Sequence, residues 1–118
     1  MANQDLGLEI RKLESLPAST TCRRIDFDKA EVRPGFIPNT WFLFVSGQKP
    51  WATMIVSLQP LIYIDKPEYW GIEVVGCLSG IGLPQTAPYT VVLDITHVLG
   101  KKGVEVMGAT RSQTISVP

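Results

Sequence analysis

The chain has 118 residues, the size of one domain, and we expect a single domain over residues 1–118. Eleven Lys and Arg residues balance eleven Asp and Glu residues, so no net field favours nucleic acid or an anionic membrane, and neither is an expected partner. The apolar fraction is 45% and the charged fraction 19%, which favours association with a protein partner or with a second copy.

The amino-terminal residues contain neither the basic stretch nor the apolar stretch of a secretory signal. No run of 18 apolar residues occurs in the chain. We therefore expect a cytoplasmic protein, or a secreted one only if a signal has been removed. Residues 6–16, LGLEIRKLESL, fit either a helical stripe ended by Pro17 or a strand, and the strand is favoured because a short segment containing Gly7 makes a marginal helix.

Nine prolines and ten glycines divide the chain into short segments, and those after residue 20 are rich in β-branched and aromatic residues, which is strand composition. Pro34 and Gly35 are expected at the centre of a type II turn, with positive φ at the glycine. Residues 100–103, GKKG, are expected to join the strands on either side as a hairpin. The expected strands are 22–27, 40–46, 52–58, 61–64, 69–78, 89–96, 104–109 and 114–117.

Short strands at spacings of about ten residues are typical of a two-sheet sandwich or a small barrel. We predict an all-β, two-sheet antiparallel sandwich of about seven to nine strands, immunoglobulin-like or a related Greek key. The order Cys22, Trp41, Cys77 invites the immunoglobulin comparison, but Val75 stands where the tyrosine corner would place Tyr. A cytoplasmic compartment favours free thiols over a Cys22–Cys77 disulfide.

The run Trp41 to Val45, WFLFV, is apolar at every position. Alternation would bury only every second residue against a core, so both faces of this strand need cover. We expect a central strand with one face in the core. If the molecule does not cover the other face, that face is a candidate interface.

The pattern GIEVVGC at 71–77 returns as GVEVMGA at 103–109. Alternation places Glu73 and Glu105 opposite the cleaner apolar face, so they are expected to be solvated or salt-bridged, and Lys101, Lys102 and Arg111 lie near Glu105 in sequence. Gly76 and Gly108 are expected where a bulky side chain packs onto bare backbone, with Trp41 and Phe44 as candidates for that side chain.

Groups for catalysis or metal binding are few. The single histidine, His97, is expected as a half-buried residue near a strand end, and two cysteines with one histidine do not make a zinc site. Asp26, Asp28 and Glu31 could offer oxygen ligands to calcium, but the position that needs glycine in a calcium-binding loop is Glu31 itself. We predict no catalytic residue, no metal site and no cofactor.

Three aromatic residues, Trp51, Tyr69 and Trp70, follow prolines at turns. Exposed rings beside polar groups hold sugars or small ligands in many sandwich modules, so these three form a tentative ligand site. The alternative interpretation is that the tryptophans fill the core.

The sequence thus predicts a non-catalytic binding or assembly module, in first place a protein-interaction or homo-oligomeric β-sandwich subunit. The alternative is a carbohydrate- or small-ligand-binding module that uses the exposed aromatic residues. A remote alternative is a small hydrolase with Glu73 and Glu105 as paired acids, or with His97 as its base.

Overall fold

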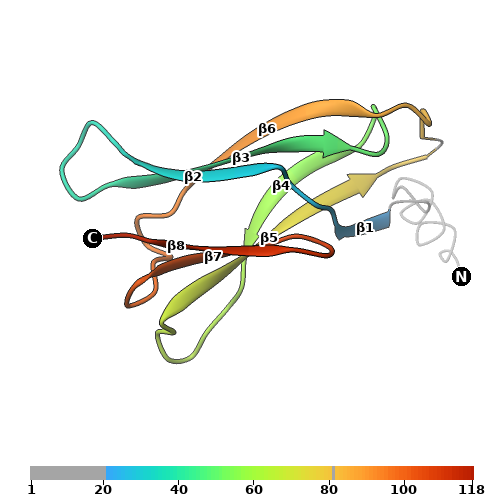
Figure 1. Ribbon diagram of the computed structural model, residues 1–118. Helices are drawn as coiled ribbons and strands as arrows, with labels where there is room; N and C mark the ends of the chain where they lie inside the picture. The colour runs from blue at the N-terminus through green and yellow to red at the C-terminus, as the bar shows by residue number, and fades with distance from the viewer. Residues whose placement is uncertain (1–20, 81) are drawn as a thin grey trace, which may run out of the picture.

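The computed structural model describes residues 21–80 and 82–118 (Figure 1), so residues 6–16 lie outside the described part. Over the described residues it contains eight strands in two sheets and no helix, which confirms the all-β, two-sheet expectation. The strands are β1 (Thr21–Arg24), β2 (Lys29–Pro34), β3 (Trp41–Lys49), β4 (Ile55–Pro60), β5 (Tyr69–Leu78), β6 (Ala87–Asp94), β7 (Gly103–Met107) and β8 (Ser112–Ser116).

The smaller sheet has three strands in the order β2-β3-β6, all antiparallel. Strand β3 lies at its centre, as predicted from the run of apolar residues at 41–45. Leu43 and Val45 are fully buried in the core, whereas Phe42 and Phe44 lie on the outward face and are half-buried. Strand β2 was missed, because KAEVRP contains three charged residues and only two clearly apolar side chains.

The larger sheet has five strands around β5. Residues 72–77 of β5 pair with β4, residues 69–73 pair with β7, and residues 75–78 pair with β1. Some residues of β5 pair with β4 on one edge and with β7 or β1 on the other. Strands β7 and β1 therefore lie end to end along the same edge of β5, and β8 pairs with β7 outside them.

The two copies of the repeated pattern lie side by side, because β5 and β7 are neighbours. They pair in parallel, with Ile72 opposite Val106, so the expectation of a purely antiparallel sandwich is wrong for this pair. The expected hairpin at residues 100–103 is also wrong. Strand β6 belongs to the three-stranded sheet and β7 to the five-stranded sheet, so the segment between them crosses from one layer to the other.

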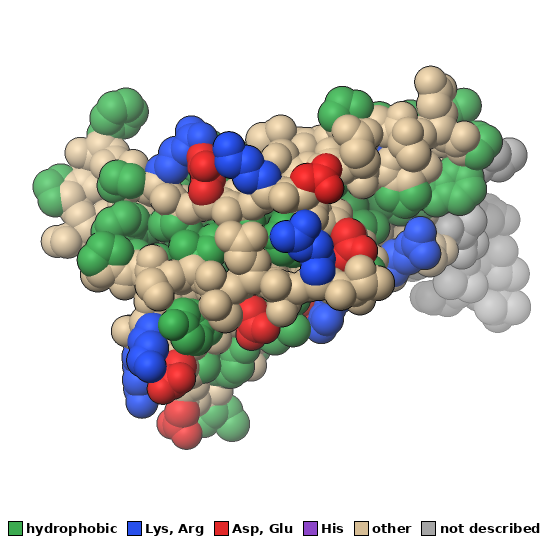
Figure 2. Space-filling view, viewed as in Figure 1, with side chains coloured by type: hydrophobic (Ala, Val, Ile, Leu, Met, Phe, Trp, Pro, Cys, Tyr) green, Lys and Arg blue, Asp and Glu red, His purple; other side chains and the backbone are tan. Residues whose placement is uncertain are grey.

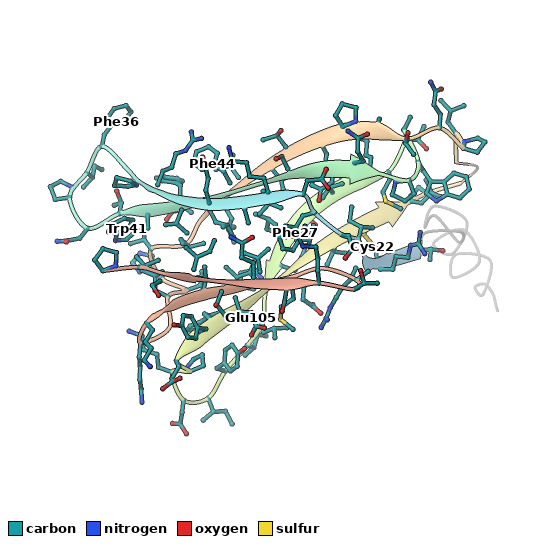
Figure 3. All side chains as sticks on the ribbon, viewed as in Figure 1. Cys22, Phe27, Phe36, Trp41, Phe44 and Glu105 are labelled. Carbon is teal, nitrogen blue, oxygen red and sulfur yellow. A yellow bond between two sulfur atoms is a disulfide. The ribbon has the colours of Figure 1, made fainter. Side chains whose placement is uncertain are left out.

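One hydrophobic core fills the space between the sheets (Figure 3), where Phe27 lies between the layers. The layers also meet along both sides, since β4 lies beside β6 and β2 beside β8. The Gln113 side chain donates a hydrogen bond of 3.2 Å to the carbonyl of Ala30 across the second of these seams. The fully buried side chains are Phe27, Leu43, Val45, Ile72, Val74, Ile95, Val104 and Val106.

Cys22 and Cys77 form a disulfide, so the expectation of free thiols is wrong. They stand directly opposite each other on the antiparallel strands β1 and β5. The expectation came from the assumed compartment, and the sequence does not reveal that two residues 55 positions apart become cross-strand neighbours. The bridge lies within one sheet, whereas the immunoglobulin disulfide joins the two sheets.

Close packing explains the glycines of the repeat, although not through the expected residues. A Cβ on Gly76 would overlap the sulfur of Met54, and one on Gly108 would lie 2.8 Å from a carboxylate oxygen of Asp26. Neither Trp41 nor Phe44 is among these nearest neighbours. Gly103, at the start of β7, is the most crowded: its φ is +157° and a Cβ would overlap the backbone carbonyl oxygen of Ile115.

Two further local expectations are wrong. Residues 61–64 form part of the β4–β5 loop and are not a strand, because Leu61 bonds back to Gly71 and the chain then turns away from the sheet. In the β2–β3 loop the residue with positive φ is Asn39, at 67°, and Gly35 is not in that region. Gly35 donates instead to the carbonyl of Thr40, at 2.9 Å, across the base of the loop.

Residues 21–80 and 82–118 include no helix that is long and apolar enough to cross a membrane.

Candidate functional site

The outward face of the three-stranded sheet carries aromatic side chains that the core does not use. Phe42 and Phe44 point outward from β3 because they alternate with the buried Leu43 and Val45. Val92 on β6 stands opposite Phe44 and is 51% exposed. We call Phe36, Phe42, Phe44 and Val92 the aromatic face.

A groove of about 420 Å³ runs along the aromatic face. Phe36 stands at the tip of the β2–β3 loop, and its side chain is fully exposed (Figure 3). The adjacent Ile37 is 70% exposed, so the tip presents two large apolar side chains to solvent. Contiguous apolar surface of this kind marks interaction sites in soluble proteins. The groove is lined by Arg33, Pro34, Gly35, Phe36, Phe42, Phe44 and Val92.

A row of charged side chains on β2 borders the aromatic face. Glu31 lies between Lys29 and Arg33 on the outward side of β2, and it accepts a 2.6 Å hydrogen bond from Arg33 Nε. The guanidinium of Arg33 also lies 4.5 Å from the centroid of the Phe44 ring, a cation–π arrangement. The hydrogen bond from Arg33 holds the pKa of Glu31 below its ordinary value. Figure 2 shows both signs of charge interspersed with apolar side chains over one view of the molecule.

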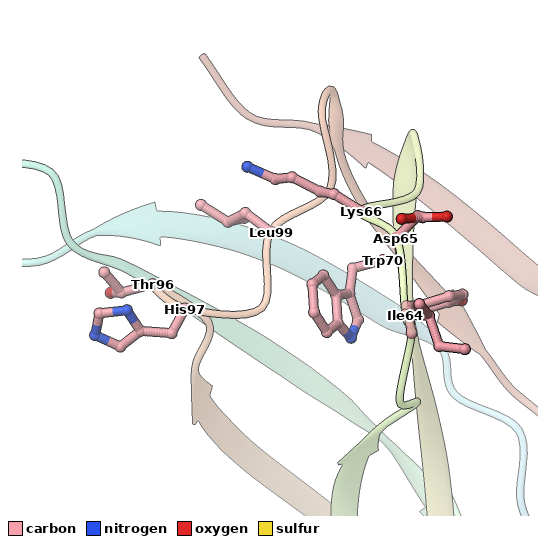
Figure 4. A pocket seen from close by; sticks show the side chains of 8 residues that line it. Ile64, Asp65, Lys66, Trp70, Thr96, His97 and Leu99 are labelled. Atoms are coloured by element: carbon pink, nitrogen blue, oxygen red, sulfur yellow. The ribbon is translucent and has the colours of Figure 1, made fainter.

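A second depression, of about 440 Å³, lies where the β4–β5 loop approaches the β6–β7 segment (Figure 4). Trp70, at the start of β5, supplies its aromatic wall and is fixed by a 2.9 Å hydrogen bond from its Nε1 to the carbonyl of Leu61. Tyr63 packs edge-on against Trp70 at 5.3 Å between ring centroids, and its hydroxyl accepts from the amide of Gly71. We call it the Trp70 pocket; it is lined by Tyr63, Ile64, Asp65, Lys66, Trp70, Thr96, His97 and Leu99.

The three residues of the tentative ligand site do not come together. Trp70 lines the pocket just described, while Tyr69 precedes it on β5 and faces the opposite side of the sheet. Trp51 lies against Leu78, at the other end of β5. Eight residues of strand separate Trp70 from Leu78, or about 26 Å. All three tryptophans are half-buried at the edge of the core, between the two expectations of full burial and open exposure.

His97 differs from its expected place. Strand β6 ends at Asp94, so His97 lies in the segment that crosses between the sheets and is exposed. It lines the Trp70 pocket, which sequence reasoning did not predict because the two residues are 27 positions apart and His97 lies in the segment that crosses between the sheets. The loop residues Asp65 and Lys66, which also line this pocket, were not predicted either.

The paired acids of the hydrolase alternative are not direct neighbours. In the β5–β7 register Glu105 stands opposite Gly71, and Glu73 stands opposite Met107. Glu73 accepts a 2.7 Å hydrogen bond from Arg24 Nε on β1 and forms an ion pair with it. The arrangement ties β1 to β5, and it does not resemble an acid–base pair.

Asp26 has a structural role. Its carboxylate accepts hydrogen bonds from the amide and the hydroxyl of Thr110, at 2.7 and 2.6 Å, and these bonds lower its pKa. The residue joins the segment before β2 to the turn before β8. Among the residues that the structure describes, no group of three His, Cys, Asp or Glu side chains is placed to hold a metal ion.

Similarity to known proteins assigns no role to either the aromatic face or the Trp70 pocket. The chain matches no protein-family model. It likewise has no match among curated proteins or among solved structures.

Proposed function

We propose that the protein is a non-catalytic assembly module that associates with another protein surface through the aromatic face. The observation that carries this proposal is the exposure of Phe36 and Val92 beside the half-buried Phe42 and Phe44. A protein surface that covered them would remove their apolar atoms from water, at roughly 25 cal/mol per Å² of area buried.

The charges around the aromatic face support the same proposal. A polar rim around an apolar centre is the usual anatomy of an interface, and Lys29, Glu31 and Arg33 supply such a rim along β2. The zero net charge of the chain means that no long-range repulsion opposes the approach of a second copy.

Self-association is the test, measured by sedimentation velocity across a range of concentrations with the disulfide intact. Val92→Glu should abolish association, because it places a carboxylate in the apolar centre. Ile55→Glu is the matched control: Ile55 is 74% exposed and lies on β4, in the other sheet. Equal association of the two variants, or a wild-type chain that stays monomeric at all concentrations, would contradict the proposal.

The Trp70 pocket favours a second candidate function, the binding of a small polar ligand such as a monosaccharide. An aromatic wall with Asp65, Lys66 and His97 at the rim offers both stacking and hydrogen bonds. Titration of tryptophan emission with a panel of monosaccharides tests it. Trp70→Phe should weaken the response and Trp51→Phe should keep it; a panel without any response removes the candidate.

The disulfide and the strand order support two further proposals, one about the cellular compartment and one about the topology of the sandwich. The Cys22–Cys77 disulfide supports an oxidising compartment, in place of the cytoplasm expected from the sequence. The return of β6 to a place beside β3, after the β4–β5 hairpin in the other sheet, supports a relation to Greek-key sandwiches. Peptide mapping of purified protein without reductant tests the disulfide, since free thiols at both positions would remove the argument for an oxidising compartment.

A further inference from the structure

We infer that the partner of the aromatic face is a second copy of this chain, packed face to face about a two-fold axis parallel to strand β3. This inference rests on the proposed function, because it names the occupant of the same surface. The positions of Arg33 and Asp94 on that surface carry it.

Arg33 and Asp94 flank the aromatic face at the same level along the strands. In the register of the sheet Arg33 of β2 and Asp94 of β6 both stand opposite Phe42 of β3, one on each side. Both residues are exposed. With neighbouring strands about 4.8 Å apart, the two positions are roughly 10 Å apart across the sheet.

Both charges are fixed by contacts within the monomer, and both keep capacity for a further partner. Glu31 binds Nε and Nη2 of Arg33. A guanidinium has five N–H donors, so donors remain for a second carboxylate. Asp94 Oδ1 accepts from the amide and the hydroxyl of Thr96, at 3.0 and 2.6 Å, and these bonds orient the carboxylate.

A two-fold axis along the strands lays β2 of one copy over β6 of the other at the same level. Arg33 then faces Asp94 of the second copy, and the symmetry forms this ion pair twice. The outward side chains of β3, Phe42 and Phe44, meet the same side chains of the second copy near the axis. Aromatic residues therefore occupy the centre of the interface and ion pairs its edges, as in interfaces generally.

An axis across the strands gives a poorer match of charge. It lays β6 over β6 and β2 over β2. The outward residues of β6 include no cation, and Glu31, the outward acid of β2, is already paired with Lys29 and Arg33 of its own copy. Asp94 of one copy would then lie over apolar or hydroxyl groups, or over the like charge of the other. Charge complementarity therefore selects the axis along the strands. The outward residues of β6 are Pro88, Thr90, Val92 and Asp94.

The size of the face sets the expected strength of the dimer. Three strands of about eight residues present a surface roughly 15 by 26 Å. This surface is smaller than the standard interface of about 800 Å² per partner. We therefore expect a dimer that dissociates on dilution.

Charge reversal tests the axis with the full-length, disulfide-bonded chain. Arg33→Glu and Asp94→Arg should each weaken the dimer roughly tenfold or more, because each places like charges across the interface. An equimolar mixture of the two variants should restore association, since in a mixed dimer both pairs again join opposite charges. The chain that carries both substitutions should also dimerise, with its two ion pairs reversed.

Lys102→Glu is the matched control, because it makes the same charge change at an exposed position outside the face. It should leave the dimer unchanged. Circular dichroism and thermal midpoints close to wild type establish that the variants fold. Sedimentation velocity of each variant, and of the mixture, gives the dissociation constants.

The possible failures are distinguishable. If Val92→Glu abolishes the dimer while the single charge variants dimerise like wild type, the proposed function stands and the axis is wrong. Failure of the mixture to associate more strongly than its components also overturns the axis. A wild-type chain that is monomeric at every concentration overturns both this inference and the proposed function.

Discussion

On the outside of the five-stranded sheet, side chains of neighbouring strands are bonded to one another, whereas the central strand of the three-stranded sheet carries aromatic side chains outward. On the outside of the larger sheet Cys77 is bonded to Cys22, and Glu73 is paired with Arg24. On the outside of the smaller sheet the central row is Phe42 and Phe44, and only the Arg33 guanidinium lies over a ring.

Both sheets contribute to the same core, so the difference does not come from packing between the layers. The difference lies in the role of the side chains that point away from the core. In the larger sheet these side chains stabilise the fold, and in the smaller sheet we propose that they bind another molecule. Substitutions in the larger sheet should therefore change the free energy of unfolding, and those on the aromatic face should change association.

The largest expected effect is loss of the disulfide. Replacing Cys22 and Cys77 together by Ala removes a link between residues 55 positions apart. In the chain-entropy model this should lower the free energy of unfolding by about 4 kcal/mol. Urea unfolding without reductant measures it, and reduced wild-type protein should behave like the variant. Equal stability of the oxidised wild type and the variant would contradict this account.

Gly103→Ala should have the next largest effect. The new Cβ would meet the backbone of β8 at the carbonyl of Ile115, which no side-chain rearrangement relieves. We expect a loss of roughly 3 kcal/mol. Gly80→Ala is the control, because Gly80 has a φ of +69° but no atom within 4 Å of a Cβ, so it should lose only about 1 kcal/mol. Similar losses in the two variants would mean that β8 can move away.

Tyr89 tests the contact between the layers. It points inward from β6, and its hydroxyl donates a 2.8 Å hydrogen bond to the carbonyl of Asp26, which precedes β2. Tyr89→Phe should lower the free energy of unfolding by about 1 kcal/mol. Chemical denaturation measures the loss, and a variant as stable as wild type would show that water replaces the bond.

The contribution of Tyr89 to stability should decrease at alkaline pH. Burial, followed by the nearby charges of Asp28 and Asp26, raises the pKa of Tyr89 from 10.0 to about 12. Because the folded pKa is above the unfolded one, the contribution to stability is full below pH 10 and is lost as the pH rises toward 12. An absorbance titration at alkaline pH should show a late phenolate step that is missing in Tyr89→Phe. A titration without the late step would contradict the burial.

The smallest effect is expected at the Arg24–Glu73 pair. Its side chains are 41% and 26% exposed, so Glu73→Gln should lower the free energy of unfolding by only about 0.5 kcal/mol. Glu31→Gln, on the other sheet, should leave stability nearly unchanged but weaken association, because Glu31 holds Arg33 in place. Loss of association in Glu73→Gln as well would contradict the division of roles between the sheets.

Alternation along single strands could be predicted from the sequence, and it gave the most informative parts of the fold. It identified the doubly apolar strand of Phe42 and Phe44, and it placed Glu73 and Glu105 away from the buried Ile72 and Val106. These conclusions depend only on neighbours along the chain. They follow directly from the two-residue repeat with which side chains alternate between the two faces of a β-strand.

Properties that depend on pairing between distant segments could not be predicted. Nothing local to Cys22 indicates that it stands opposite Cys77, and nothing local to Gly103 indicates that β8 passes against it. Trp70 and His97 line one pocket only because the segment that crosses from β6 to β7 passes near the start of β5. The outward face of β3 was predicted as a candidate interface from the sequence. Its charged border was not predicted, because strand β2 itself was not predicted.

The shared edge of β5 has a consequence for how the chain folds. Strand β1 supplies one part of that edge and β7 the other, and the amide of Ile25 bonds to the carbonyl of Val74 between them. The central strand of the larger sheet is therefore fully paired only after the chain has been synthesised beyond residue 107. Until then its edge is open to another strand, so folding should be slow for the chain's size, and nascent chains should be prone to mispairing.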